Sequence, residues 1–217
     1  MEVLMSSARL HLVCLVVCFL LGGNASASPC SLAIDTDVVI AVADSKATMY
    51  HSWGGIVLSP GLVHFLKTFV SQCDYSKVRI SIVAVSNTVR LLAPFTNNPN
   101  DLHLAIQSWR PQFKGAKRSL ALRSIRSYFK TDARPKAARI VIDVTPQQSE
   151  NYFATLSESL QLRADHVAII GVGYGRYAPS QELMAMTGSR NRVLITANDY
   201  FLIYFVKPIK QLICTRE

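Results

Sequence analysis

Apolar runs rich in β-branched residues alternate along the chain with segments whose apolar residues recur every three or four positions. The first pattern is typical of buried parallel strands, and the second of amphipathic helices that cover a sheet. The apolar runs predict strands at residues 37–43, 78–85, 139–144, 166–172 and 192–195. The amphipathic segments predict helices at residues 60–73, 100–109, 119–130, 150–163, 180–186 and 198–212.

One further short run, residues 88–92, follows the second strand after only two residues. That gap is too short for a crossover helix, so the run predicts an antiparallel strand at the sheet edge. Pro146 is expected to end its strand, because proline cannot donate to the ladder. The expected fold class is therefore α/β, with a doubly wound, mostly parallel central sheet, one antiparallel edge strand and helices on both faces. No linker divides it, so residues 30–214 are expected to form one domain.

The first 28 residues have the pattern of a secretory signal peptide. Arg9 supplies the positive charge, residues 10–21 form the apolar run, and Ala25-Ser26-Ala27 suits signal peptidase. A permanent membrane anchor is the alternative interpretation, but the run is shorter than the roughly 20 residues that span a bilayer. We therefore expect a secreted, extracellular protein without a stable membrane anchor.

Removal of that peptide leaves three cysteines, Cys30, Cys73 and Cys214. Two of them lie at the ends of the mature chain, and the secretory route is oxidising. We therefore expect a disulfide between Cys30 and Cys214, with free thiols as the alternative. Cys73 is left over, either buried or available to another chain.

The 217 residues are 50% hydrophobic, which excludes a disordered chain, and their formal net charge of +9 favours an acidic partner. Nine basic residues against one acidic residue lie between Lys114 and Arg139. On the helix expected there, Arg123, Arg126 and Lys130 form an outward stripe. The stripe is either a solvated face or a docking surface for a polyanion, such as a sulfated glycosaminoglycan, or for an acidic protein. A secreted chain argues against nucleic acid.

Few residues of the mature chain suit catalysis. Its four histidines have neither metal-ligand nor nucleophile-elbow spacing. The glycine-rich run 171–175 lacks the spacing of a phosphate-binding loop, because Arg176 occupies the position of the last glycine. We expect a non-enzyme without a cofactor; a hydrolase or nucleotide-binding enzyme on a similar fold is the alternative.

Four stretches, in order and spacing, resemble the von Willebrand factor type A domain family, which includes the integrin I domains. They are residues 37–42, 78–95, 120–144 and 169–173, the last reading Ile-Ile-Gly-Val-Gly. The terminal cysteines are similar to those of extracellular-matrix members. The resemblance implies a binding or adhesion module rather than an enzyme.

The family also implies a metal-ion-dependent adhesion site, in which an Asp-x-Ser-x-Ser loop, a Thr and an Asp hold Mg²⁺ through oxygen ligands. An alignment from Asp37 without a gap puts Ala43, Ser45 and Ala47 of the first loop at the Asp, Ser and Ser positions of this motif. An alignment with one inserted residue puts Asp44, Lys46 and Thr48 at the same three positions. Neither register keeps all three oxygens.

The other two loops also depart from the family pattern. Ala116 stands at the Thr position and Pro146 at the Asp position, while Lys46, Lys117 and Arg118 add positive charge. We therefore expect a degenerate site that binds no metal. Its rim is expected to comprise Asp44, Ser45, Lys46, Thr48, Ala116, Lys117, Arg118 and Pro146.

Two alternatives concern this rim. A residual Mg²⁺ site through Asp44, Thr48 and Asp143 would keep metal-dependent binding. Lys46 either reaches into the vacated position, to pair with Asp44 or a partner's acid, or points into solvent. The expected function is a secreted, non-catalytic adhesion module that binds an extracellular protein or matrix ligand without metal.

Overall fold

The computed structural model describes residues 34–52, 55–112 and 114–214. Its main element is a six-stranded sheet in the order β5-β4-β1-β6-β7-β8. The strands are β1 (Thr36–Ala43), β4 (Val78–Val85), β5 (Val89–Thr96), β6 (Ala138–Thr145), β7 (Val167–Tyr174) and β8 (Val193–Thr196). The five parallel strands and the edge strand predicted from the sequence are all present.

Neighbouring strands are parallel except at one edge, where β5 pairs antiparallel with β4. The predicted edge strand is therefore confirmed, although it continues to Thr96 rather than ending at residue 92. Every residue of β1 and β7 is buried, as expected for strands covered on both faces. Pro146 follows directly after β6 ends.

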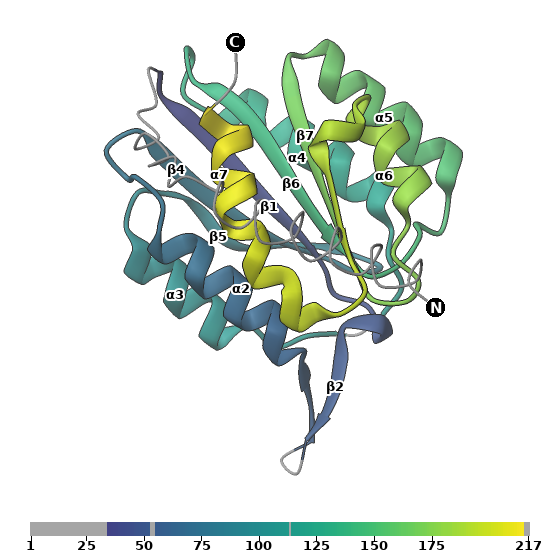
Figure 1. Ribbon diagram of the computed structural model, residues 1–217. Helices are drawn as coiled ribbons and strands as arrows, with labels where there is room; N and C mark the ends of the chain where they lie inside the picture. Colours follow the sequence, from purple (N-terminus) through teal and green to yellow (C-terminus); the bar gives the residue numbers. More distant parts are fainter. Residues whose placement is uncertain (1–33, 53–54, 113, 215–217) are drawn as a thin grey trace, which may run out of the picture. The chain divides into compact units, whose positions relative to one another are not determined.

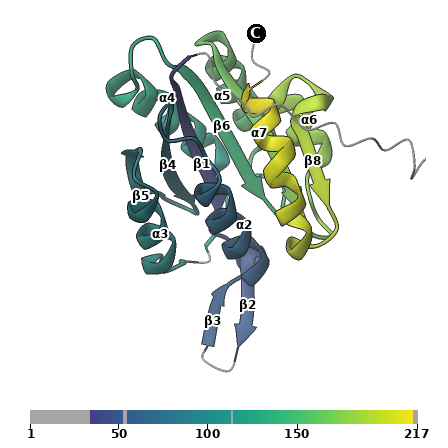
Figure 2. The same cartoon turned by 60° about the vertical axis from the view of Figure 1, so that its left-hand side comes forward.

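Helices cover both faces of the sheet (Figures 1 and 2). One face carries α2 (Pro60–Ser71), α3 (Pro99–Ser108), the 3-10 helix η3 (Asp199–Phe205) and α7 (Val206–Cys214). The other face carries α4 (Arg118–Asp132), α5 (Tyr152–Ala164) and α6 (Ser180–Thr187). Short 3-10 helices η1 (Lys46–Thr48) and η2 (Arg190–Arg192) lie in the connections. The fold is the expected doubly wound α/β class, with the last predicted helix divided into η3 and α7.

The core depends on the spacing of apolar residues along the helices. In α4, Leu122, Ile125 and Phe129 are each 1% exposed, because three- and four-residue steps bring them to one face. They pack in one cluster with Val39 of β1 and Val141 of β6. The opposite face of α4 is thereby left for its basic residues.

The antiparallel hairpin of β2 (Met49–Ser52) and β3 (Gly55–Leu58) was not predicted from the sequence. It follows η1 after the end of β1 and projects from the sheet-and-helix layers (Figures 1 and 2). Within the described residues, these strands pair only with each other. Each has four residues, too few for a clear alternating pattern.

The predicted signal peptide, residues 1–28, and Cys30 lie outside the described residues, so both the peptide and the bridge to Cys214 stay predictions. Cys73 is a free, half-buried cysteine whose thiol donates a hydrogen bond to the carbonyl of Phe69 at 3.2 Å. Burial raises the pKa of Cys73 to about 12, which disfavours the reactive thiolate. No helix in the described part of the chain is long and apolar enough to span a membrane.

Candidate functional site

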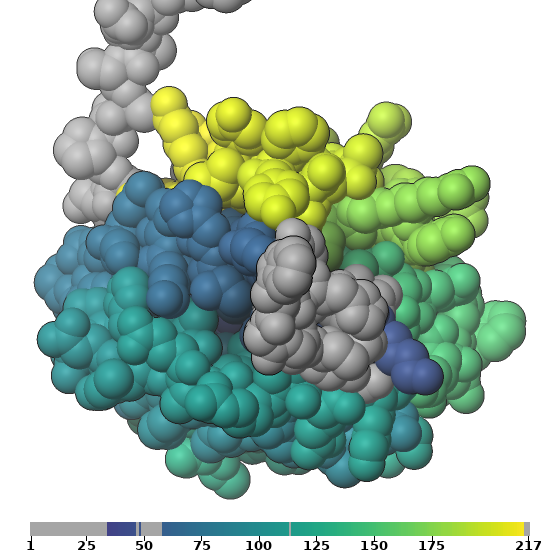
Figure 3. All heavy atoms as spheres, turned by 90° about the horizontal axis from the view of Figure 1, so that it is seen from below, coloured from purple at the N-terminus to yellow at the C-terminus, as the bar shows by residue number. Residues whose placement is uncertain are grey.

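The carboxyl ends of the parallel strands β1, β6 and β7 meet at one edge of the sheet, where ligands bind in open α/β folds. We call this edge the rim; it consists of residues 43–48, 114–118, 145–151 and 175–182. Figure 3 looks onto this face, where segments far apart in the sequence come together. The rim contains every residue of the metal-site prediction except Asp143, which lies in β6 beside it.

Asp44, the first acid of the rim, is fully buried and bound by protein groups. One carboxylate oxygen lies 2.8 Å from Nη2 of Arg90, on β5. The backbone N–H of Gln112 donates to both oxygens, at 2.9 and 3.0 Å. The carboxylate therefore ties the end of β1 to the edge strand and to the loop after α3.

The other polar residues of the first loop do not converge with Asp44. The hydroxyl of Thr48 donates to the carbonyl of Ser45 at 2.6 Å, closing the turn of η1. The hydroxyl of Ser45 is buried without a hydrogen-bond partner among the described residues. Lys46 is exposed, so of the two interpretations of this side chain, the one that points it into solvent agrees with the structure.

In the second loop, a backbone group binds an acid where the family has a Thr. Ala116 is buried, and its N–H donates to a carboxylate oxygen of Glu150 at 3.1 Å. Lys117 is exposed and precedes α4. Its backbone N–H donates to the carbonyl of Ser86 at 3.0 Å. This loop therefore offers the rim a cationic side chain and no hydroxyl.

Arg118 opens α4 and has only 3% of its side chain exposed. Its Nε lies 3.2 Å from a carboxylate oxygen of Asp143, and its Nη1 lies 2.9 Å from one of Glu182. Nη2 donates to the hydroxyl of Thr145 at 2.6 Å and to the carbonyl of Gln147 at 2.8 Å. Arg118 therefore brings its positive charge to the rim in a buried position: its three guanidinium nitrogens face four oxygens from β6, its following loop and α6.

Two carboxylates share this one guanidinium. Burial raises the pKa of Asp143 above its ordinary value, the charge of Glu182 adds to the rise, and Arg118 opposes it. Glu182 has further donors in the N–H of Ser149, at 2.9 Å, and the Ser149 hydroxyl. We call Arg118, Asp143, Thr145 and Glu182, with the Gln147 carbonyl, the Arg118 cluster.

The residues present do not fit the divalent ion that the fold family implies. Asp44 is bound by Arg90 and Gln112, and Arg118 forms an ion pair with one oxygen of Asp143. Within the described residues, no three His, Cys, Asp or Glu side chains gather as a metal cluster. The Ser45 hydroxyl is the one unpartnered buried oxygen of the first loop, and one oxygen is too few for Mg²⁺.

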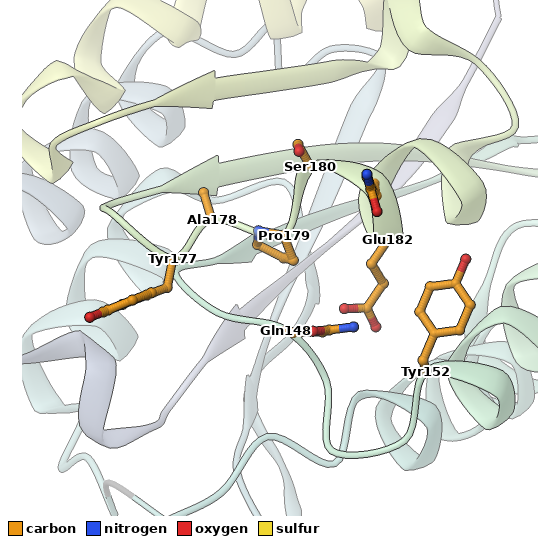
Figure 4. Close-up of a pocket in the computed structure, with 8 residues that line it drawn as sticks. Gln148, Tyr152, Tyr177, Ala178, Pro179, Ser180 and Glu182 are labelled. Carbon is orange, nitrogen blue, oxygen red and sulfur yellow. The ribbon is translucent and has the colours of Figure 1, made fainter.

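A cavity of about 570 Å³ lies beside the Arg118 cluster (Figure 4). Gln148, Pro179 and Glu182 converge in it, and Tyr152 and Tyr177 lie on its two sides. The cavity is bounded by the loop before α5 and by the loop before α6 together with its first turn. Such volumes suit a small ligand or a protruding side chain of a partner.

The basic stripe predicted on α4 faces acids of the neighbouring helix. Arg123 and Arg126 lie 2.7 and 3.7 Å from Glu158, and Lys130 lies 3.3 Å from Asp165. Arg123 and Lys130 still expose 64% and 57% of their side chains, against 26% for Arg126. Arg123 and Lys130 thus point outward, Arg126 is half-buried, and the charge of the stripe is partly neutralised by acids in and directly after α5.

Sequence reasoning missed Arg90, Glu182 and Thr145 as partners within the site. Arg90 and Glu182 lie 46 and 64 residues from the side chains they bind, so no local spacing joins them. Glu182 carried one weak signal, because an acid in the first turn of a helix favours the N-terminal end of its dipole.

Residues 37–206 match the family model of the von Willebrand factor type A domain. Proximal thread matrix protein 1 from the mussel byssus has a similar structure, with a TM-score of 0.74 and 21% identity over 83% of this chain and 48% of that one. A second structure of that protein, described as having a zinc-occupied MIDAS motif, has a TM-score of 0.70 and 20% identity over 85% and 49%. The chain thus spans about half the length of these proteins.

A third similar structure is the manganese-loaded TRAP protein of Plasmodium vivax, with a TM-score of 0.68 and 14% identity over 81% of this chain and 73% of that one. No curated protein sequence matches this chain significantly. At these identities the structural neighbours establish the fold alone.

Proposed function

Because the chain belongs to the von Willebrand factor type A domain family, we propose that it is a secreted, non-catalytic module that binds an extracellular protein or matrix ligand through its rim, without a divalent metal ion. The matrix protein of the mussel byssus among the structural neighbours supports an extracellular setting. Secretion here rests on the predicted signal peptide, and the bridge between Cys30 and Cys214 would close the domain in that setting.

The Arg118 cluster is the main observation in favour of ligand binding without a metal ion. A guanidinium supplies positive charge and fixed donors to Asp143, Thr145 and Glu182. In doing so it joins β6, the loop after β6 and α6. This is the bridging that a metal ion performs between loops, carried out by a side chain of the protein itself.

The contact surface for the partner comprises the exposed ammonium groups of Lys46 and Lys117 and the neighbouring cavity. Tyr177, 73% exposed, lies at one side of that cavity. Exposed aromatic rings and cations are common anchors of protein interfaces. An acidic side chain of the partner is therefore expected to contact Lys46 or Lys117 at the place where relatives hold a metal ion.

Isothermal titration with Mg²⁺ and Mn²⁺ tests metal independence. We expect no heat of binding from the wild-type chain, and a pull-down from matrix extract that is unchanged by chelator. The matched control is Asp44→Ala. Micromolar binding by the wild type that this substitution abolishes would favour the residual site through Asp44, Thr48 and Asp143.

A sulfated glycosaminoglycan is the second candidate ligand, on the basic stripe of α4. The large exposure of Arg123 and Lys130 supports it, whereas pairing with Glu158 and Asp165 weakens the field. Reversal of Arg123, Arg126 and Lys130 to Glu is expected to abolish salt-dependent retention on heparin. Unchanged elution would leave the stripe a solvated face.

A further inference from the structure

A second cavity, of about 370 Å³, lies at the opposite ends of the strands from the rim. It is formed by the end of α5, the start of β7 and the turn after α6. Its lining residues are Arg163, His166, Val167, Ala168, Thr187, Gly188, Ser189 and Arg192. Its volume is near the lower end of the roughly 300–1,000 Å³ of ligand sites. We call it the Arg163 pocket.

Arg163 is held in this pocket by a glycine turn. Gly188 ends α6 with a φ of 66°, a conformation that favours glycine. A Cβ at Gly188 would lie 1.6 Å from Nη1 of Arg163, so the guanidinium packs where a side chain would otherwise be. Glycine is thus required both by the turn and by the arginine.

The packed guanidinium retains an unsatisfied donor. Nε of Arg163 is buried and has no hydrogen-bond partner in the described part of the chain. Buried donors in folded proteins are almost always satisfied, by protein or by a bound group. The side chain is therefore held in position at the wall of the pocket, with one buried donor unsatisfied.

The charged residues that line the pocket are arginines, and no acidic residue is among its lining residues. Arg163 and Arg192 supply two guanidinium groups, His166 an imidazole and Ser189 a hydroxyl. The acid beside His166, Asp165, lies 3.3 Å from Lys130 and is not among the lining residues. Planar guanidinium donors with an adjacent hydroxyl match the geometry of a tetrahedral oxyanion.

We propose that the Arg163 pocket binds the anionic ester group of a sulfated or phosphorylated sugar. The oxyanion meets Arg163 and Arg192, and the remaining volume accepts the sugar ring. This inference extends the glycosaminoglycan part of the proposed function to another site, independent of the rim and of the α4 stripe. A short ligand suffices, because one ester occupies the pocket.

Titration of the full chain with three short probes tests the proposal: a trisulfated heparin disaccharide, its desulfated form and glucose 6-phosphate. We expect the sulfated disaccharide or the sugar phosphate to bind, and the desulfated form not to bind. The probe that binds identifies the ester. Arg192→Glu, at a half-buried position, is expected to lower that affinity by more than about tenfold, with an unchanged melting temperature.

Arg163→Gln is the second variant and is expected to weaken binding in the same way. Arg110→Glu is the matched control, because Arg110 is an exposed arginine in the loop after α3, outside the rim, the α4 stripe and the pocket. Binding of neither ester, or equal affinity in both pocket variants and the wild type, would overturn the proposal. The variant of the α4 stripe is expected to lose retention on heparin and to keep disaccharide binding. A wrong proposal for the stripe and a wrong proposal for this pocket therefore give different results.

Discussion

At the scale of single residues, the buried ion pairs of this protein differ in how completely they are satisfied. Arg118 has an oxygen within 3.2 Å of each of its three nitrogens, although Nη1 makes no hydrogen bond among the described residues, and it lies at a helix start that has no side-chain cap. Asp37, at the other end of β1, forms ion pairs with two arginines, Arg79 and Arg134. Because breaking a buried pair leaves a desolvated charge behind, both residues are expected to matter more than their number of contacts suggests.

We expect Arg118→Met to lower the free energy of unfolding by about 3–5 kcal/mol, because Asp143 and Glu182 then lose their shared cation. Asp143→Leu in the same chain is expected to recover part of that loss. Lys117→Met, at the exposed neighbour, is the control and should change stability by less than about 0.5 kcal/mol. Chemical denaturation measures all four proteins; equal stability of wild type and Arg118→Met contradicts the argument.

Asp37 predicts an acid-sensitive stability. Burial acts to raise the pKa of Asp37, but hydrogen bonds and charges of Arg79 and Arg134 outweigh it and hold the pKa below the ordinary value. A folded-state pKa below the unfolded value of about 3.9 stabilises the fold above that pH, and this contribution is lost as pH falls through the folded value. Asp37→Asn should therefore make the free energy of unfolding decrease less steeply as the pH falls in the acid range. A decrease in the free energy of unfolding as steep as that of the Asp132→Asn control would contradict this.

At the scale of elements, the β2–β3 hairpin and the sheet are expected to differ in local stability. The hairpin pairs only with itself among the described residues, and an isolated two-stranded hairpin is marginally stable. Strand β1 has two parallel neighbours and is buried throughout. Amide hydrogen exchange should therefore be at least about 100-fold faster in 49–58 than in β1. Equal protection would indicate that the hairpin packs on another surface.

Elements also differ in how well their sequence predicts them. The strands β1, β4, β6 and β7 were predictable because burial on both faces imposes long apolar runs, and α4 because its core-facing residues recur at helical spacing. The hairpin was not, since strands of only four residues are too short for such a pattern. Replacement of the metal by Lys46 was one of two interpretations left open by the sequence, whereas the guanidinium beside the rim acids belongs to Arg118. That could not be predicted, since a basic residue at a helix start gives no local sign of distant acids.

At the scale of the whole molecule, the two ends of the parallel strands have separate chemistry. The rim combines exposed lysines, a cavity lined by polar and apolar residues and internally paired acids, whereas the Arg163 pocket at the other end contains two arginines and a buried donor without a partner among the described residues. A ligand at one end leaves the other accessible. The two proposed sites would thus allow the domain to hold two partners of different kinds at once.

The guanidinium of Arg118 is covalently part of the polypeptide, so it cannot be washed out, exchanged or outcompeted. Its local concentration is set by the fold and stays the same in dilute or ion-rich surroundings. The adhesion proposed for this rim would therefore not depend on the supply of a divalent ion from the surroundings.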